Sequence, residues 1–371
     1  MKVLQTTLLT GPYDWEANVL PREEFEGRLA RIRTALKDAG AVALLVHGHA
    51  GDYGALNYVS AFTPKLGPAL ALVSAEGDMR LLVGGSDLMI PQAKRLTWVD
   101  DVQPFANVPK RVADWLGAKK GGTVAAWGTG SLAHGIQRGI AAAVGPLQPM
   151  DAILDPIRRR KSPRELQLVR RASEILGSAM SSLIAAARGG AGARSAALAA
   201  ECAAIAAGAQ DARTLASLSP GGAPLPLDGP EDRVLDPLLA AVAVQVAGYW
   251  AAGTVTVSKR GGAALGRAEA ALAAMLEAAR PGATGAALRQ AAAQKLAPFS
   301  LHLALNGTLC NAIGLSLDEG PLADADTLEP GATYALRVGA AGEGGDAAIV
   351  SAMIAIGDTG ASVLWTSPRS P

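Results

Sequence analysis

Four histidines are the first candidates for acid–base or metal chemistry in this chain. His47 and His49 lie one residue apart at the end of an expected strand, where they supply at most two metal ligands, and capping of the following loop is the favoured interpretation. His134 lies in the same half of the chain. His302 is the sole histidine of the second half. An imidazole can serve as a general base near neutral pH, but a structural role is the favoured interpretation for a lone histidine.

A single arginine interrupts an apolar strand pattern in LEPGATYALRVGA, residues 328–340. Because side chains alternate along a strand, Arg337 shares a face with Thr333 and Ala335, whereas its direct neighbours point the other way. A guanidinium stays protonated in proteins, so a buried one needs an acceptor or an anion. The pattern therefore predicts either an internal ion pair or an anchor for the carboxylate or phosphate of a ligand.

The two cysteines, Cys202 and Cys310, lie far apart in the sequence. Neither a disulfide framework nor a thiolate zinc site follows from such spacing. Cys310 adjoins Asn311, but no histidine lies beside it to form a thiolate pair, and a buried structural role is favoured. This use of cysteine fits a reducing compartment, and we expect a cytoplasmic protein.

The composition of the 371-residue chain gives no indication of a strongly charged partner. Its formal net charge is +1, with acids and bases intermixed, so nothing favours nucleic acid or an anionic membrane. The basic run at residues 158–161 is interpreted as solvated surface or as an ion-pair site between domains. The first 21 residues lack the features of a signal peptide, and no apolar run approaches the roughly 20 residues that span a bilayer. We therefore expect a soluble intracellular protein.

Alternating helix and strand patterns predict an α/β domain over residues 1–155. REEFEGRLARIRTALKDAG, which begins at Arg22, places its apolar residues on one helical face, and the strand pattern AVALLVHG follows at once. PALALVSAEGDMRLLVGG predicts a hairpin that turns at residues 76–78, and GGTVAAWGTG predicts a further strand.

A second domain is predicted over residues 156–371, where Ser162-Pro163 begins a long helix. RSAALAAECAAIAAGA and GRAEAALAAMLEAARPGA are alanine-rich helices that serve as scaffold. LLAAVAVQVAGYWAAGTVTVS, LRVGA and AAIVSAMIAIGD are strand candidates with the apolar density of buried strands. The chain as a whole is predicted to be of the α+β class.

Five motifs in a fixed order resemble those of the creatinase, aminopeptidase P and prolidase family, and they cover nearly the whole chain. NYVSAF, at Asn57, lies in the first domain and RRKSPRELQLVRRA at the entry to the second; GYWAAGTVT, NAIGLSLDEGP and LEPGATYALRVG follow. The resemblance implies a creatinase-like N-terminal α/β domain and a C-terminal pita-bread domain of antiparallel sheet flanked by helices. It also implies a homodimer, in which the first domain of one subunit approaches the active site of the other.

The same resemblance locates the metal ligands of the peptidases in this family. Those enzymes hold two divalent metal ions with two aspartates, one histidine and two glutamates, which activate a bridging hydroxide and polarise the peptide carbonyl. None of the matching positions in this chain keeps its ligand: Ala241 or Val244 and then Ala252 replace the aspartates, Asn311 the histidine, and Arg337 and Val350 the glutamates.

A second family histidine, which contacts substrate, matches Asp318, so Asn311 and Asp318 keep the family's interval of seven residues. Because Arg337 brings a fixed positive charge to the former metal cluster, we expect no metal and no other cofactor. Asn311, Asp318 and Glu319 are the expected acceptors for its guanidinium. The predicted pocket consists of Asn311, Asp318, Arg337, His302 and Tyr249.

Three functions follow from these residues, and no catalytic residue is assigned. The preferred one is a pseudopeptidase whose pocket binds a small molecule, a peptide or a protein, with a small anion or a peptide as the favoured partner. The alternative is a metal-independent hydrolase of carbon–nitrogen bonds in a small metabolite, as in creatinase, with His302 or Asp318 as the base. An ordinary Xaa-Pro metallopeptidase follows from the fold alone, and the ligand positions argue against it.

Overall fold

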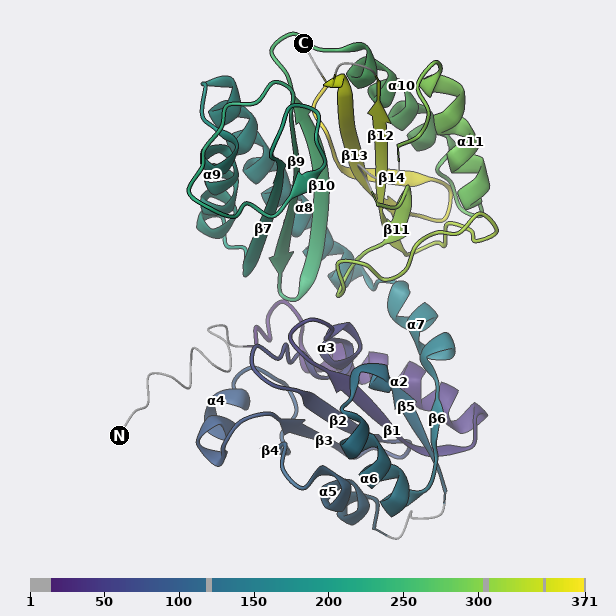
Figure 1. The fold of residues 1–371 in the computed structure, drawn as a ribbon. Coiled ribbons are helices and arrows are strands. Elements are labelled where there is room, and N and C mark those ends of the chain that lie inside the picture. Colours follow the sequence, from purple (N-terminus) through teal and green to yellow (C-terminus); the bar gives the residue numbers. More distant parts are fainter. Residues whose placement is uncertain (1–14, 118–121, 303–306, 343–344, 370–371) are drawn as a thin grey trace. The chain divides into compact units, whose positions relative to one another are not determined.

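The computed structural model describes residues 15–117, 122–302, 307–342 and 345–369. The chain divides into two compact units, Met1–Arg158 and Arg159–Pro371 (Figure 1). Within the described ranges, no helix is long and apolar enough to cross a membrane.

The first unit is built on one six-stranded sheet with the order β4-β3-β2-β1-β5-β6. Strand β1 pairs antiparallel with β2 and parallel with β5. The strands are β1 (Ala41–Gly48), β2 (Ala69–Ser74), β3 (Met79–Val83), β4 (Val102–Pro104), β5 (Thr123–Trp127) and β6 (Leu147–Pro149). The helices are α2 (Arg22–Asp38), α3 (Gly54–Ser60), α4 (Ile90–Ala93), α5 (Val108–Leu116), α6 (His134–Val144) and α7 (Asp151–Arg159), with short 3₁₀ turns η1 (Asp87–Met89) and η3 (Thr129–Ser131).

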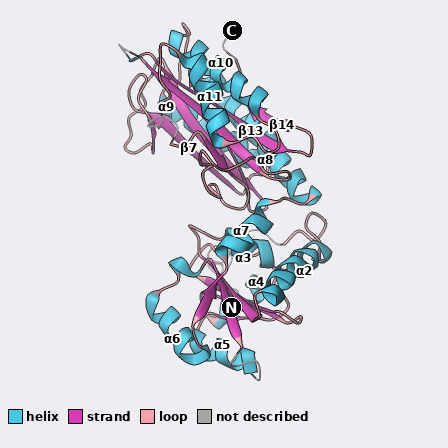
Figure 2. Ribbon diagram, turned by 90° about the vertical axis from the view of Figure 1, so that its right-hand side faces the viewer, coloured by secondary structure: helices cyan, strands magenta, loops and turns pink. Residues whose placement is uncertain are grey.

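Helices cover both faces of this sheet. Leu45 and Leu72 project from β1 and β2 into a core with Val112 of α5 and Ile140 of α6. Helix α2 packs on β1 from the other side, as Figures 1 and 2 show. The predicted hairpin is present, since β2 and β3 pair antiparallel. The expected α/β layering of this region is therefore observed.

The second unit contains two four-stranded sheets, with the orders β10-β9-β7-β8 and β11-β12-β13-β14. The strands are β7 (Asp211–Ser217), β8 (Pro224–Leu225), β9 (Leu238–Val246), β10 (Tyr249–Val257), β11 (Cys310–Ala312), β12 (Thr333–Ala341), β13 (Ala347–Ile356) and β14 (Ala361–Thr366). The helices are α8 (Pro163–Arg188), α9 (Ala193–Ala206), α10 (Ala263–Ala278) and α11 (Gly285–Leu296). Together with the first unit, this mixture of helix and sheet confirms the predicted α+β class.

The four helices cover one face of each sheet. Helices α8 and α9 contact β7, β9 and β10, whereas α10 packs on β12 and β13 with α11 beside it (Figure 1). Strands β9 and β10 are joined by Ala247 and Gly248, which both have positive φ angles, 47° and 87°. Such a pair is typical of the tight hairpin turns whose twist matches that of the strands. The turn fixes the register of β9 against β10, on which the site depends.

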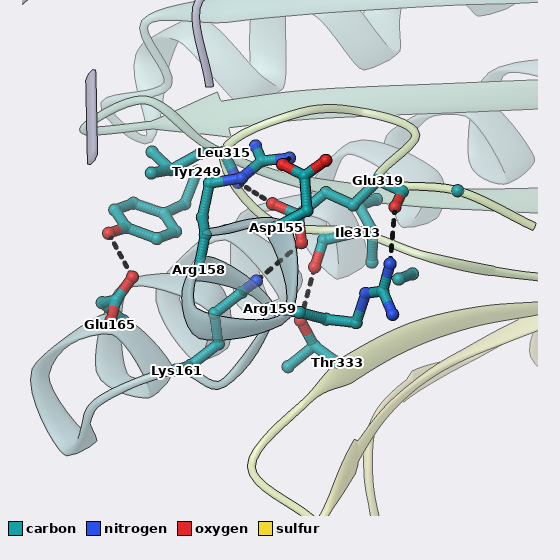
Figure 3. A network of polar contacts seen from close by, with 12 residues as sticks. Asp155, Arg158, Arg159, Lys161, Glu165, Tyr249, Ile313, Leu315, Glu319 and Thr333 are labelled. Atoms are coloured by element: carbon teal, nitrogen blue, oxygen red, sulfur yellow. Dashed lines mark hydrogen bonds and ion pairs between the residues drawn. The ribbon is translucent and has the colours of Figure 1, made fainter. Parts of the chain in front are cut away.

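The entry to α8 is held by buried polar contacts (Figure 3). Ser162 and Glu165 form a reciprocal capping box at the first turn. Lys161 pairs with Glu319 at 2.7 Å, and both side chains are 1% exposed. Arg159 pairs with Glu329 at 3.4 Å. The interpretation of the basic run as solvated surface is therefore wrong for Lys161, because its charge is buried against a carboxylate of the same unit.

Candidate functional site

Arg337 lies at the middle of β12, on the face that points away from helix α10. Strand β12 pairs with β13 so that Arg337 is directly opposite Ser351, and with β11 so that Asn311 is opposite Ala335. Directly paired residues of an antiparallel sheet share a face. We call the face of β11, β12 and β13 that carries Asn311, Arg337 and Ser351 the arginine face.

Asn311 is a hydrogen-bond acceptor of the guanidinium. Arg337 Nη1 donates to Asn311 Oδ1. The amide nitrogen of Asn311 donates to the carbonyls of Ala312 and Leu317, at 2.9 and 3.2 Å. Because both of these partners are acceptors, they fix the amide with its oxygen toward Arg337. The predicted pairing of Arg337 with Asn311 is observed.

The two carboxylates expected near Arg337 have other partners. Glu319 accepts hydrogen bonds from Lys161 Nζ and from the backbone N–H of Leu315, at 2.7 and 3.0 Å. Asp318 is exposed, and its carboxylate accepts the N–H of Gly320 at 2.9 Å. Glu319 is thus held by Lys161 and by the backbone of Leu315.

Burial dominates the ionisation of the groups around Arg337. Loss of solvation lowers the pKa of Arg337, an effect opposed by Cys310 and by the negative charge of Asp318. Loss of solvation also raises the pKa of the Cys310 thiol to about 12, although the nearby cation of Arg337 opposes the shift. Cys310 is therefore a protonated thiol at neutral pH, which agrees with a structural role rather than a nucleophilic one.

Val350 does not share the arginine face. It pairs with Val338, and both side chains belong to the apolar core beneath α10 together with Leu336. The residue opposite Arg337 is Ser351, which sequence reasoning missed. A shift of one residue in strand register moves every side chain to the other face. The assignment of Val350 to the degenerate metal positions is thus at odds with the strand register, which places Ser351 there.

Strand register also decides between the two candidates on β9. Ala252 of β10 is directly opposite Ala243, so Ala241 shares the face of Ala252. Val244 is opposite Ala251 and points to the other side. Of Ala241 and Val244, only Ala241 can contribute to the same site as Ala252.

The position of Trp365, on β14, shows which way each face of β10 points. A Cβ atom added to Gly253 would lie 2.3 Å from the Trp365 ring, so this face of β10 looks toward β14. Ala252 and Thr254 project from the opposite face, toward β12. The backbone N–H of Thr254 donates to Ser351 Oγ at 2.6 Å. Leu239 of β9 lies on the Ala252 face and packs with Ile349 of the arginine face, so these two faces meet.

Tyr249 lies outside this site. It shares the β10 face of Gly253, because residues at odd intervals from Ala252 point away from it. Its hydroxyl donates to Glu165 Oε1 of α8 at 2.8 Å, and both residues are fully buried (Figure 3). The prediction that Tyr249 lines the pocket is therefore wrong, and its physical role is to close the capping box of α8.

His302 lies on the arginine face at the far end of β12. Its backbone N–H donates to the Gly339 carbonyl at 2.8 Å, and Leu301 bridges to Ala340. Leu301 packs against the core under α10, so the alternating side chain of His302 points to the other face. The buried Nδ1 atom of His302 has no hydrogen-bond partner.

The positions that the resemblance relates to metal ligands carry no carboxylate, imidazole or thiolate in this chain. They are Ala241 or Val244, Ala252, Asn311, Arg337 and Val350, and Ser351 is the residue directly opposite Arg337. Divalent metal ions in proteins are most often held by carboxylate or imidazole donors, and here an amide and a hydroxyl accompany a cation. Within the part of the chain that the structure describes, no group of three or more His, Cys, Asp or Glu residues could hold a metal ion.

Two histidines of the first unit, His47 and His49, make local contacts with loop residues. His47 Nδ1 lies 3.2 Å from both the Gly128 carbonyl and Ser131 Oγ, and burial lowers the pKa of its ring. His49 Nδ1 accepts the N–H of Gly51 at 3.1 Å. These contacts agree with the capping role favoured by the sequence.

The chain belongs to metallopeptidase family M24, whose sequence model matches residues 167–359. No curated protein matches the sequence closely enough to be reported as a relative. The family assignment agrees with the resemblance carried by the sequence motifs.

Solved structures show the same fold across nearly the whole chain. The prolidase from Pyrococcus horikoshii OT3 has 18% identity and a TM-score of 0.73, with 93% of this chain and 99% of that chain covered. The X-Pro aminopeptidase from Thermotoga maritima MSB8 has 20% identity and a TM-score of 0.73, with 92% and 98% covered. The Xaa-Pro dipeptidase from Bacillus anthracis has 16% identity and a TM-score of 0.72, with 93% and 99% covered. The predicted two-domain architecture with a pita-bread fold is thereby confirmed.

Proposed function

We propose that this chain is a pseudopeptidase of family M24, which binds a ligand at the site where metal-dependent relatives cleave one. The observation that carries this proposal is the hydrogen bond from Arg337 to Asn311, which joins two positions related to metal ligands. The degenerate positions on this reading are Ala241, Ala252, Asn311, Arg337 and Ser351.

The physical reason is the sign of the charge at the site. A metal pair is stabilised by several negative donors, whereas Arg337 contributes a cation that cannot be deprotonated. At a separation of about 4 Å even an effective dielectric constant of 20 makes the repulsion between two unit charges about 4 kcal/mol. The missing carboxylates cannot offset that repulsion. The same cation favours a small anionic ligand or the carboxylate of a peptide.

Metal content, thermal unfolding and dipeptidase assays together test the proposal. We expect purified protein to contain no stoichiometric Mn, Co or Zn, and its melting temperature to be unchanged by these ions. We also expect no hydrolysis of Xaa-Pro dipeptides with the ions added. A metal-dependent prolidase assayed in parallel is the positive control. Dipeptidase activity that requires Mn or Co and disappears with a chelator would contradict the proposal.

A metal-independent hydrolase is the second candidate, because His302 Nδ1 is buried and without a partner on the arginine face. Asp318 is the weaker base, since its exposed carboxylate holds the N–H of Gly320. Turnover of an amide or amidine that is lost in His302→Gln, with the fold retained by circular dichroism, would favour this function over the first.

A further inference from the structure

A cavity of about 400 Å³ lies in the second unit, between the end of β7 and the segment that precedes β9. Its wall includes Leu218, which follows β7, Ala193, the first residue of α9, and most of the segment 227–235. Small-molecule sites in proteins usually have volumes of roughly 300–1000 Å³. The cavity is therefore large enough for a small ligand, and none of its lining residues belongs to the positions related to metal ligands.

One carboxylate of the segment between β8 and β9 differs from the others. Asp232 accepts two N–H groups of the first turn of α9, at 3.0 and 3.2 Å, and Glu231 pairs with Arg233 at 2.6 Å. Asp236 accepts a hydroxyl and a backbone N–H from the residues after β10, at 2.8 and 3.2 Å. Asp228, by contrast, has neither a hydrogen bond nor an ion pair with any residue that the structure describes, and it lines the cavity. The cavity thus presents a carboxylate that is available to a cation.

The backbone on both sides of Asp228 is held by Arg194. The Nη2 atom of Arg194 donates to the carbonyls of Leu227 and Gly229, the first at 3.1 Å. These contacts restrict the chain where it carries Asp228. Less conformational entropy is therefore lost when a ligand binds to this carboxylate.

Three leucines give the cavity an apolar part. Leu218, Leu227 and Leu235 line it together with Asp228. Leu218 is 42% exposed, and Leu227 and Leu235 are partly exposed. Removal of such apolar surface from water is favourable, roughly in proportion to its area. The cavity therefore combines an available negative charge with a surface for a short hydrocarbon chain.

We propose that this cavity binds a short aliphatic monoamine. The ammonium group donates to the Asp228 carboxylate, and the hydrocarbon chain contacts the three leucines. The charged lining residues are Asp228, Glu231 and Arg233, two acids and one base, so the lining has a net charge of −1. This charge matches one ammonium group and opposes a carboxylate ligand. The inference goes beyond the proposed pseudopeptidase function and does not depend on it, because it uses other residues.

Calorimetric titration of the full-length protein tests the ligand class. Butylammonium chloride is the probe, in phosphate buffer at pH 7, where an alkylamine is protonated. Butanol, sodium butyrate and ammonium chloride at equal ionic strength are the comparison solutes, since each lacks either the cation or the chain. We expect saturable binding of butylammonium that is tighter than that of any comparison solute. Butyrate or butanol that binds as tightly would overturn the assignment to an amine, and the absence of saturable butylammonium binding would overturn the site itself.

Two aspartates of the same segment provide matched variants. Asp228→Asn removes the charge at an exposed position, so the fold should be retained and butylammonium affinity should fall about fivefold or more, as for an ion pair with a hydrogen bond. Asp236→Asn removes an equal charge from a residue that does not line the cavity, and affinity should be retained. Unchanged affinity in Asp228→Asn, or an equal loss in both variants, would refute the role of Asp228.

The apolar part is tested by chain length and by a pair of leucines. From ethylammonium to butylammonium, affinity should rise by up to about fourfold for each methylene that is buried. Leu227→Ala should reduce this gain. Leu225→Ala should not, because Leu225 is 49% exposed but does not line the cavity. Affinity that is independent of chain length, or an equal effect of the two substitutions, would contradict the proposed contact.

Discussion

At the scale of single residues, the charges of the second unit are arranged in two different ways. Lys161 and Glu319 neutralise one another in contact, and both are 1% exposed. Arg337 donates to the neutral amide of Asn311 and is influenced by the charge of Asp318. The first arrangement is complete within the protein. The second joins the guanidinium to a neutral acceptor, and the charge of the exposed Asp318 acts on it from outside that contact.

The Lys161–Glu319 pair gives a prediction about stability. Lys161→Met should lower the free energy of unfolding by about 3–5 kcal/mol, because it leaves the Glu319 carboxylate buried without its cation. Urea unfolding measures the change. Lys161→Met combined with Glu319→Gln removes both charges and keeps an oxygen for the N–H of Leu315, so most of the loss should be recovered. A double variant as unstable as the single one would contradict this account.

At the scale of elements, the close packing of β10 against Trp365 requires a glycine at position 253. A Cβ atom at Gly253 would lie 2.3 Å from the ring of Trp365, whereas one at Gly266, on α10, would meet nothing within 4 Å. We expect Gly253→Ala to destabilise the protein by about 1–3 kcal/mol through overpacking. Gly266→Ala should stabilise it by up to about 1 kcal/mol, since alanine is the better helix former. Thermal unfolding of both variants checks the opposite signs, and changes of the same sign would disprove the reasoning.

The sequence predicted those parts of the site that a local motif fixes. Asn311 is the first residue of the motif NAIGLSLDEGP, and Arg337 closely follows the motif LEPG. The structure brings the two side chains into contact. Ser351 could not be found in this way, because its face depends on how β13 pairs with β12, and a slip of one residue exchanges Ser351 for Val350. The surroundings of Tyr249 could not be predicted for a related reason, because its partner Glu165 lies on α8, which is distant in the sequence. Local sequence patterns thus predicted the helices and strands. The pairing between strands determined on which face of the sheet each side chain lies.

At the scale of the whole molecule, the chain retains the architecture of family M24. Structures with 16–20% identity share this fold over more than nine-tenths of the chain, and similarity at that level establishes the fold alone. Function must therefore be argued from the side chains of the site. For this chain the proposal made above therefore rests on Arg337 and Asn311 and not on the fold.

The family resemblance also predicts assembly into a homodimer. Sedimentation equilibrium should give twice the mass of the chain over a range of concentrations that includes micromolar protein. The Lys161→Met variant is a suitable comparison, because its change is buried and should leave the assembly state unaltered while the protein remains folded. A single species with the mass of one chain at every concentration would refute the prediction.

Ser367, which follows β14, forms hydrogen bonds with both sheets of the second unit. Its hydroxyl donates to the carbonyls of Thr254 and Ser351, and accepts the Ser351 N–H at 2.8 Å. A proteolytic cut or a gene truncation after Thr366 would remove only a short tail, yet it would leave these backbone groups of β10 and β13 without their partner. Ser367 therefore links β10 of one sheet to β13 of the other. Removing it should weaken the contact between the two sheets.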